Sequence, residues 1–319
     1  MANPIQDQAE GLRRLLVQDN DFRAVTVISG SSGTGKTIAV INLATALSQS
    51  GKKVLIIDEN AGASNLGGTL GLSAHRDLLD VVRRDMTLDK VLIQHPDGYS
   101  ILPAGRGMRV LDKLNPDDQA HLIDSFANVA PPMDVVLVDA AAGSTSRLLS
   151  LAFPCHEVVV VVSSQPASIT TAYALIKHIT GNSGNQRFRV LVNKVGDETE
   201  AKKIFDNMAR VANRYLSVSL DFIGFIPPDD RLRQSIRRGR AIMNLFPASA
   251  SAIAFGRAAE RLVNRLPGDG KNEEDSGGMR GFMQSLTGLR QDIQSGSPGP
   301  GQHTRPINAI TQETRSNHV

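Results

Sequence analysis

The sequence lacks several features that mark other protein classes. Its 319 residues include no tryptophan, one cysteine and 4% aromatic residues. The single cysteine, Cys155, excludes an intramolecular disulfide and suits a reducing compartment. Scarce aromatic rings leave little to stack single-stranded nucleic acid bases, which argues against such a partner. No apolar run approaches the roughly 18 residues of a membrane-spanning helix. None of the scattered histidines forms a pair at helical spacing, so we expect no histidine metal site.

The composition favours a folded domain with a mildly basic surface. Hydrophobic residues make up 41% of the chain, which supports a sizeable core. The formal net charge is +3 and the isoelectric point is near 9.1. This excess permits contact with anionic lipid or nucleic acid and demonstrates neither. The N-terminus is polar and mixed in charge, so we expect no secretion signal.

A glycine-rich stretch at residues 29–37 lies between an apolar run (24–28) and an apolar-rich run (38–47). It fills every fixed place of the phosphate-binding pattern G-x-x-x-x-G-K-[ST]. Lys36 is expected to reach the β- and γ-phosphates of a nucleotide, and the Thr37 hydroxyl to ligate magnesium. The residues expected to surround the phosphates are Gly30, Ser31, Ser32, Gly33, Thr34, Gly35, Lys36 and Thr37.

Residues 24–266 alternate between strand-like and helix-like segments. Valine- and isoleucine-rich runs at 54–57, 135–138, 158–162 and 190–192 are typical of parallel strands buried on both faces, and 101–102 and 220–226 show the pattern less clearly. Helices are expected at 116–128, 168–180, 199–215 and 248–266. The alternation predicts a doubly wound α/β fold with a mainly parallel sheet, whose ligands bind beyond the carboxyl ends of the strands.

Polar residues end several of these strands. Asp139 has the placement of an aspartate that holds magnesium through water, although an aspartate there also serves as a helix or turn cap. Asp58 is expected near the metal or the attacking water. Asn193 can read a nucleobase with its amide, although asparagine is also a common turn residue.

The ends of the chain differ from its centre in composition. Residues 1–22 are expected to form a short amphipathic helix and a linker, and the helix either docks on its own domain or folds onto a partner. The nucleotide-binding domain is expected at 23–266, a flexible linker at 267–278 and a disordered tail at 295–319. An amphipathic helix is expected at 279–294, with Met279, Phe282, Met283, Leu286 and Leu289 on its apolar face. The helix carries only two cations, Arg280 and Arg290, whereas membrane-surface helices usually carry more. Its apolar face therefore fits packing on the domain or on a protein partner as well as it fits a membrane surface.

Five arginines cluster late in the domain: Arg231, Arg233, Arg237, Arg238 and Arg240. Such a cluster is usually a solvated face. It also has the charge to contact phosphates, lipid headgroups or DNA.

Together the phosphate loop, residues 58–65, residues 139–143 and Asn193 resemble the MinD/ParA-like ATPases. The segments 7–13, 167–177 and 220–227 are similar to the FlhG/FleN subgroup of flagellar-number regulators. The resemblance spans residue 5 to about residue 266, and its N-terminal and 167–177 segments are the more specific parts.

This resemblance implies a cytoplasmic protein that binds ATP and Mg²⁺ and switches between a monomer and an ATP-bound dimer. Relatives limit flagellar number and placement through the GTPase FlhF and, in some bacteria, a flagellar transcription activator. By resemblance, Asn193 and Pro227 contact the nucleotide, and the helix at 279–294 contacts the inner membrane. By the same resemblance, the residues expected to stimulate the GTPase are Asp7, Gln8, Ala9, Leu12 and Arg13.

Two departures from the family pattern affect the expected catalysis. The family loop has a lysine, which reaches the partner's ATP, where this chain has Ser31, and a glycine where it has Ser32. The family's Asp-x-Asp is Asp58-Glu59-Asn60 here, and an amide cannot act as a base. With Lys36, Asp58 and Asn60 as the catalytic set, we expect nucleotide binding with slow or absent hydrolysis.

Two other functions fit the same sequence. One is a ParA-type partitioner of DNA or cargo, which requires ATP-dependent DNA binding by the arginine cluster. The other is a scaffold that does not hydrolyse ATP and only presents Gln8 to a GTPase.

Overall fold

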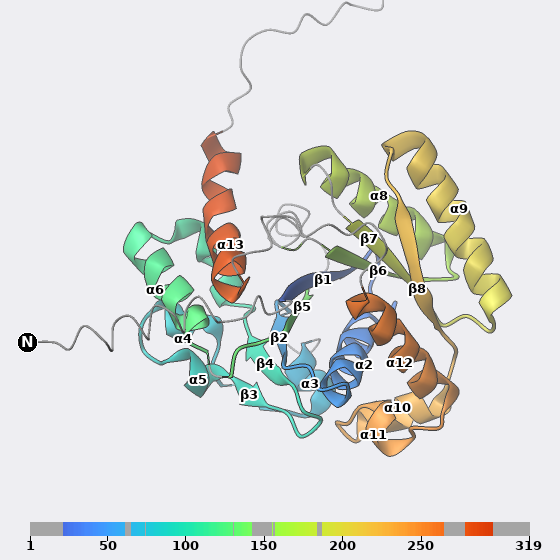
Figure 1. The fold of residues 1–319 in the computed structure, drawn as a ribbon, viewed down its shortest axis with the longest axis horizontal. Coiled ribbons are helices and arrows are strands. Elements are labelled where there is room, and N and C mark those ends of the chain that lie inside the picture. The colour runs from blue at the N-terminus through green and yellow to red at the C-terminus, as the bar shows by residue number, and fades with distance from the viewer. Residues whose placement is uncertain are drawn as a thin grey trace, which may run out of the picture.

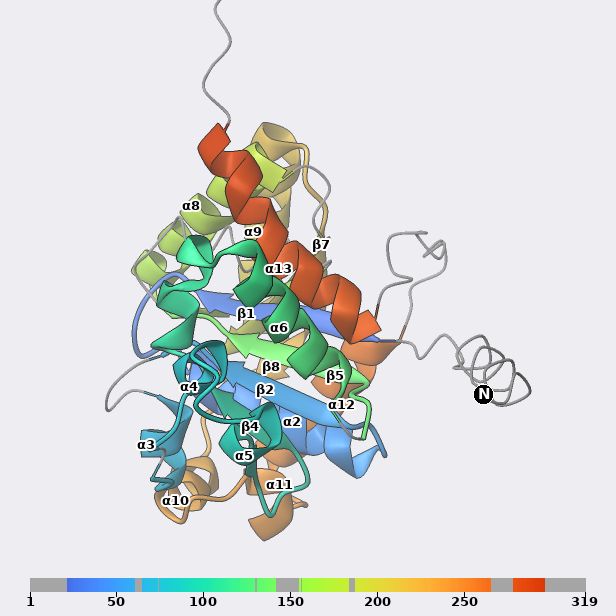
Figure 2. The same ribbon diagram turned by 90° about the vertical axis from the view of Figure 1, so that its left-hand side faces the viewer.

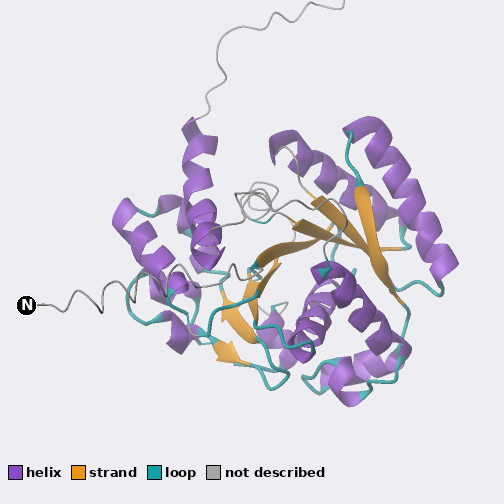
Figure 3. Ribbon diagram, in the orientation of Figure 1, coloured by secondary structure: helices purple, strands orange, loops and turns teal. Residues whose placement is uncertain are grey.

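A central sheet flanked by helices forms the body of the molecule (Figure 1). The computed structural model describes residues 22–60, 65–73, 75–129, 131–141, 155, 157–183, 187–264 and 278–295. In this part of the chain no helix is both long enough and apolar enough to cross a membrane. Colouring by secondary structure shows the strands enclosed between helices (Figure 3).

The sheet has the spatial order β3-β4-β2-β5-β1-β6-β7-β8 within the described residues. Its strands are β1 (Arg23–Ser29), β2 (Val54–Asp58), β3 (Ile93–Gln94), β4 (Ser100–Pro103), β5 (Val135–Asp139), β6 (Glu157–Ser163), β7 (Arg187–Asn193) and β8 (Leu220–Ile226). β3 pairs antiparallel with β4, and the other neighbouring strands pair in parallel. The mainly parallel, doubly wound sheet that the sequence predicts is therefore present.

Alternate residues of the strands enter two different cores. Along β1, Ile28 belongs to one core and Val27 to the other, and both side chains are almost fully buried. Strands covered by helices on both faces need apolar side chains at every position, which explains the continuous valine and isoleucine runs.

The helices divide between the two faces of the sheet. The first core is covered by α4 (Leu78–Val82), α5 (Leu88–Val91), α6 (Pro116–Ala127), α8 (Pro166–Ser183), α9 (Glu198–Leu216) and α13 (Gly278–Ser295). The second is covered by α2 (Lys36–Gln49), α3 (Leu66–Leu70), α10 (Asp230–Arg237), α11 (Ile242–Leu245) and α12 (Ala250–Val263). The short turns η2 (Gly107–Arg109) and η3 (Leu111–Lys113) precede α6.

The C-terminal helix α13 is packed against the domain. It runs beside α6 in both views (Figure 2). Phe282, Met283 and Leu286 are buried in the first core. The Phe282 ring lies 6.2 Å from that of Phe22, and Arg280 Nη2 lies 2.5 Å from Asp124 Oδ1 of α6. The apolar face of α13 is therefore occupied by the domain in this structure.

Removing the Phe282 ring should loosen α13. We expect Phe282→Ala to lower the free energy of unfolding by about 3 kcal/mol, because it leaves a cavity at the contact with Phe22. Amide hydrogen exchange in α13 should also accelerate. Gln284→Ala on the exposed side of the same helix is the control. Equal exchange in α13 of both variants would contradict this packing.

Candidate functional site

The phosphate loop connects β1 to α2 and needs glycine at two positions for different reasons. Gly35 precedes the first residue of α2 with φ 94°, and a Cβ there would lie 2.3 Å from Asn193 Nδ2. A Cβ on Gly30 would lie 2.5 Å from the backbone nitrogen of Ala172 in α8. The loop is therefore held between α8 and the end of β7 with no room for side chains at these two points.

Three donors meet at the carboxylate of Asp139, which is fully buried at the end of β5. Lys36 Nζ donates to Oδ1. Thr37 Oγ1 donates to Oδ2 at 2.9 Å, and Asn60 Nδ2 donates to Oδ2 at 3.0 Å. The structure thus brings together four of the residues that the sequence places at the site, from the loop, β5 and the segment after β2.

Asp58 lies next to this centre at the end of β2. Asn60 donates to Asp58 Oδ1 through both its backbone nitrogen and Nδ2, each at 3.0 Å. Leu66 N donates to Asp58 Oδ2 at 2.6 Å. Asn60 is therefore a donor shared by two acidic side chains, and a carboxylate in its place would repel both.

Burial is the largest cause of the raised pKa of Asp58. Burial, and after it the negative charge of Asp139, raise the Asp58 pKa from its ordinary value of 3.8 to a net value of about 6. The hydrogen bonds from Asn60 and Leu66 act in the opposite direction. An added cation would relieve this repulsion between carboxylates.

The residues fit a nucleotide with a magnesium ion. The Thr37 hydroxyl and the carboxylates of Asp139 and Asp58 are hard oxygen ligands of the type magnesium prefers. The described residues include no group of three or more His, Cys, Asp or Glu side chains placed to hold a metal alone. A magnesium ion here would therefore take its other ligands from phosphate oxygens and water.

Asn193 ends β7 and Pro227 follows β8, and these neighbouring strands lie on the opposite side of β1 from β5. Asn193 pairs with Ile226, the residue before Pro227. Asn193 is 6% exposed, and its Nδ2 donates to Thr34 O of the loop at 2.8 Å. Its Oδ1 accepts from Lys194 N at 2.9 Å. The amide that the sequence assigns to a nucleobase therefore already contacts the phosphate loop.

The structure places two further residues at the site, Glu59 and Lys194, that the sequence motifs do not indicate. Glu59 is buried, and its Oε2 accepts from Ala141 N at 2.7 Å, which joins the segment after β2 to the segment after β5. Lys194 Nζ donates to Gly33 O of the loop at 2.6 Å. Glu59 occupies a variable place of its motif, so only an acidic residue type signals it.

The structure describes only some of the residues predicted for the N-terminal partner site and the C-terminal amphipathic helix. The residues Asp7, Gln8, Ala9, Leu12 and Arg13 lie outside the described part of the chain, as does the side chain of Leu289. Met279, Phe282, Met283 and Leu286 lie in α13 and pack against the first core.

The arginine cluster is partly engaged within the domain. Arg240 Nε contacts Asp97 Oδ1 at 2.6 Å, and Asp97 is buried. Arg231 lies over the Phe246 ring at 5.8 Å. Arg233 pairs with Asp230 at 3.4 Å on the surface of α10. These contacts give part of the cluster a structural role.

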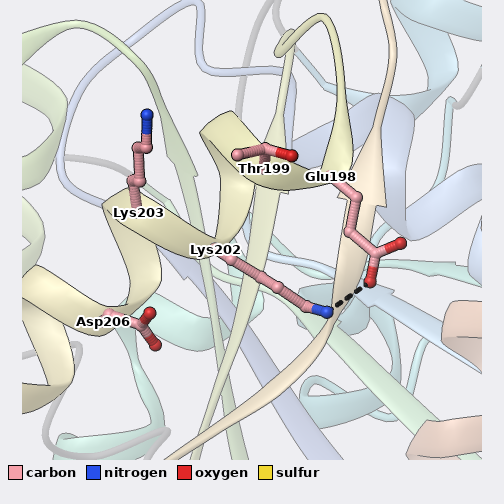
Figure 4. A pocket seen from close by; sticks show the side chains of 5 residues that line it. All are labelled: Glu198, Thr199, Lys202, Lys203 and Asp206. Atoms are coloured by element: carbon pink, nitrogen blue, oxygen red, sulfur yellow. Dashed lines mark ion pairs between the residues drawn. The ribbon is translucent and has the colours of Figure 1, made fainter.

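A separate pocket lies on α9 and is formed by one helix (Figure 4). It is lined by Glu198, Thr199, Lys202, Lys203 and Asp206. Lys202 Nζ pairs with Glu198 Oε1 at 2.9 Å one turn away. None of the sequence-predicted site residues lines this pocket, so we do not assign the nucleotide to it.

Sequence comparison agrees with the site. Residues 25–242 match the CobQ/CobB/MinD/ParA nucleotide binding domain. The chain belongs to this family. The match includes the phosphate loop, Asp58, Asp139 and Asn193, which are the residues that the fold brings to the strand ends.

Two proteins whose sequences are similar to this chain have names that refer to antiactivation and to flagella. It is 36% identical over 240 residues to the antiactivator FleN of Pseudomonas aeruginosa, across 75% of this chain and 86% of FleN. It is 26% identical over 268 residues to the flagellum site-determining protein YlxH of Helicobacter pylori, across 82% and 88% of the two chains. The predicted resemblance to the FlhG/FleN type is thereby confirmed.

Solved structures of the MinD/ParA family share the fold. A chain of the MinC:MinD cell division complex of Aquifex aeolicus has a TM-score of 0.61 and 25% identity, over 77% of this chain and 97% of that chain. MinD of Pyrococcus horikoshii, complexed with Mg-ADP, has a TM-score of 0.59 and 23% identity, over 77% and 98%. These similarities confirm the P-loop NTPase fold class.

The raised Asp58 pKa gives a testable pH dependence. Between about pH 4 and pH 6 the folded protein retains a proton on Asp58 that the unfolded chain releases. Without magnesium, the free energy of unfolding should therefore fall as the pH rises through this window, by about 2–3 kcal/mol relative to Asp58→Asn. Chemical denaturation of both proteins in EDTA measures the difference. Profiles that stay parallel from pH 4 to pH 7 would disprove it.

Proposed function

We propose that the chain is an ATP-binding, MinD-like regulator of flagellar number and flagellar biosynthesis. The observation that carries the proposal is the convergence of Lys36 and Thr37 on Asp139 behind a complete phosphate loop, in a chain 36% identical to FleN. The family match supports nucleotide binding, and the printed names of FleN and YlxH support the regulatory role.

In this function Lys36 would exchange its internal partner, Asp139, for a phosphate of ATP. The loop N–H groups and the N-terminus of α2 would hold the phosphates, and Lys36 would contact a phosphate oxygen. Thr37 and Asp139 are the residues that would hold magnesium, with Asp58 beside them. A magnesium ion bound by these residues would offset the negative charge of the phosphates and the two carboxylates.

Hydrolysis is slow in this proposal because two catalytic charges are missing. Ser31 offers no cation to the transition state, and Asn60 already donates its amide to Asp58 and Asp139. An amide held in that way orients the carboxylates and does not accept a proton from water. The chain then senses ATP by binding it, as a weak ATPase at most.

The output passes through partners that the family resemblance implies. ATP favours a homodimer, and residues 7–13 stimulate an FlhF-type GTPase, with a flagellar transcription activator as a second partner. The protein acts in the cytoplasm, and its contact with the inner membrane requires α13 to leave α6, since Phe282, Met283 and Leu286 are buried there.

A ParA-type partitioner is the second candidate, supported by the basic surface of α10. The contacts of Arg240 with buried Asp97 and of Arg231 with the Phe246 ring count against DNA as the main partner. A non-hydrolysing scaffold is the third candidate, and the two experiments below separate it from a nucleotide switch.

The nucleotide prediction concerns binding and turnover separately. The unmodified protein should bind ATP with magnesium and turn it over slowly. Lys36→Ala should weaken binding by at least about tenfold, because a charge-assisted phosphate contact is lost. Ser31→Lys should raise turnover by at least about tenfold with little change in affinity. Ser31→Gln is the control for side-chain length. Rapid turnover by the unmodified protein, lost in Lys36→Ala, would contradict the proposed slow hydrolysis.

The partner prediction uses an FlhF-type GTPase and the full chain. GTP hydrolysis by the GTPase should increase when the chain is added with ATP, and Gln8→Ala should abolish most of the increase. Gln6→Ala is the matched control in the same segment. Stimulation that persists in Lys36→Ala would favour the scaffold, and no stimulation by any variant would refute the GTPase role.

A further inference from the structure

The segments that follow β2 and β5 remain side by side beyond the last residues of the two strands. Asp58 and Asp139, which end these strands, are direct neighbours in the sheet. One residue further on, Glu59 N donates to Asp139 O at 3.2 Å. The next hydrogen bond involves a side chain, because Glu59 Oε2 accepts from Ala141 N at 2.7 Å. Glu59 therefore bonds to the backbone on both sides of Ala140.

Glu59 reaches these groups from the face of the sheet opposite α2. Side chains alternate between the two faces along a strand, so Ile57 lies in the first core and Ile56 in the second. Asp58 lies on the face of the second core, since its Oδ2 accepts from Leu66 N at the start of α3. The same alternation places Glu59 on the face of the first core, where it is 3% exposed. Its carboxylate thus stands apart from those that fit magnesium.

Two of the three donors to the Asp139 carboxylate are groups that the proposed function assigns to the ligand. Lys36 donates to Oδ1 and would contact a phosphate oxygen instead. Thr37 donates to Oδ2 and would ligate magnesium. The contacts of Glu59 involve the backbone of the segment and no ligand group. Together with the Asn60 amide, they are contacts to this segment that a bound nucleotide would leave in place.

A buried glutamate at this place is costly unless its carboxylate has a task. A buried carboxylate loses its solvation by water, and a hydrogen bond from a backbone N–H offsets part of that loss. An apolar side chain of similar length would fill the first core at lower cost. The bond with Ala141 gives the Glu59 carboxylate such a task, at the segment that carries Asp139.

We propose that Glu59 is a positioning residue for a magnesium-bound nucleotide: it fixes the end of β5 so that the Asp139 carboxylate stays in place when Lys36 contacts a phosphate. The proposal rests on the proposed function, because it assumes a nucleotide and magnesium at the phosphate loop. It gives a role to the middle residue of Asp58-Glu59-Asn60, where the family motif has no fixed residue type.

The first test measures ADP affinity by calorimetry on the full chain, with magnesium and in EDTA. The ratio of the two affinities is the magnesium enhancement. Glu59→Gln removes the charge and retains an oxygen that can accept from Ala141 N. Glu59→Met has a similar length and suits an apolar core, but its sulfur is a weak acceptor. Ile57→Val, in the same core, is the control for a general loss of stability, which thermal unfolding measures for each variant.

The second test needs no ligand and follows the amide hydrogen exchange of Ala141 by NMR, in EDTA. Exchange should be at least about tenfold faster in Glu59→Met than in the unmodified protein, because the amide loses its acceptor. It should stay nearly unchanged in Glu59→Gln. Equal exchange in all three proteins would show that Glu59 does not hold this segment and would overturn the inference.

We expect Glu59→Met to reduce the magnesium enhancement about tenfold and to change ADP affinity in EDTA less than about threefold. Glu59→Gln and Ile57→Val should retain most of the enhancement. Equal weakening with magnesium and in EDTA, or an equal loss in Glu59→Gln, would refute a positioning role through Ala141. An unchanged enhancement in Glu59→Met would refute it with the proposed function intact. An unmodified chain that binds no ADP, or binds it without magnesium enhancement, would overturn both proposals.

Discussion

The ion pair between Lys36 and Asp139 joins the parts of the molecule on which the site depends. It ties the start of α2 to the end of β5, 103 residues away in the chain. Asp139 is fully buried, so its charge is tolerated only because Lys36, Thr37 and Asn60 all donate to it. Any ligand that takes Lys36 away must bring a cation to Asp139. A phosphate that arrives with magnesium meets that condition, and a phosphate alone does not.

The same arrangement connects the nucleotide site to the segments after β2. Asn60 contacts both Asp58 and Asp139, and Asp58 in turn holds Leu66 at the start of α3. A change of charge at Asp139 therefore alters contacts that position α3. Direct hydrogen bonds thus connect Asp139, through Asn60 and Asp58, to the start of α3.

The fold could be predicted where the physical signal is local. The run at 54–57 became β2 (Val54–Asp58), since a strand buried on both faces needs apolar residues throughout. The short α4 and α5 and the two-residue strand β3 gave no such signal, because they are too short to show a period. The phosphate loop and Asp139 were identified from residue type and strand ends. The contact of Lys194 with Gly33 was not, because it joins residues 161 apart through a geometry that only the folded chain defines.

The tight seating of the phosphate loop divides its positions by their tolerance to substitution. At Gly30 and Gly35 a side chain would collide with α8 or with Asn193. Ser32 is exposed and Ser31 is half-buried. The loop can therefore exchange residues at 31 and 32, where the family resemblance implies a lysine and a glycine, and keep its shape. Under the proposed function, phosphate binding and catalytic rate would depend on different positions of one short loop, so that a chain could lose the second while it keeps the first.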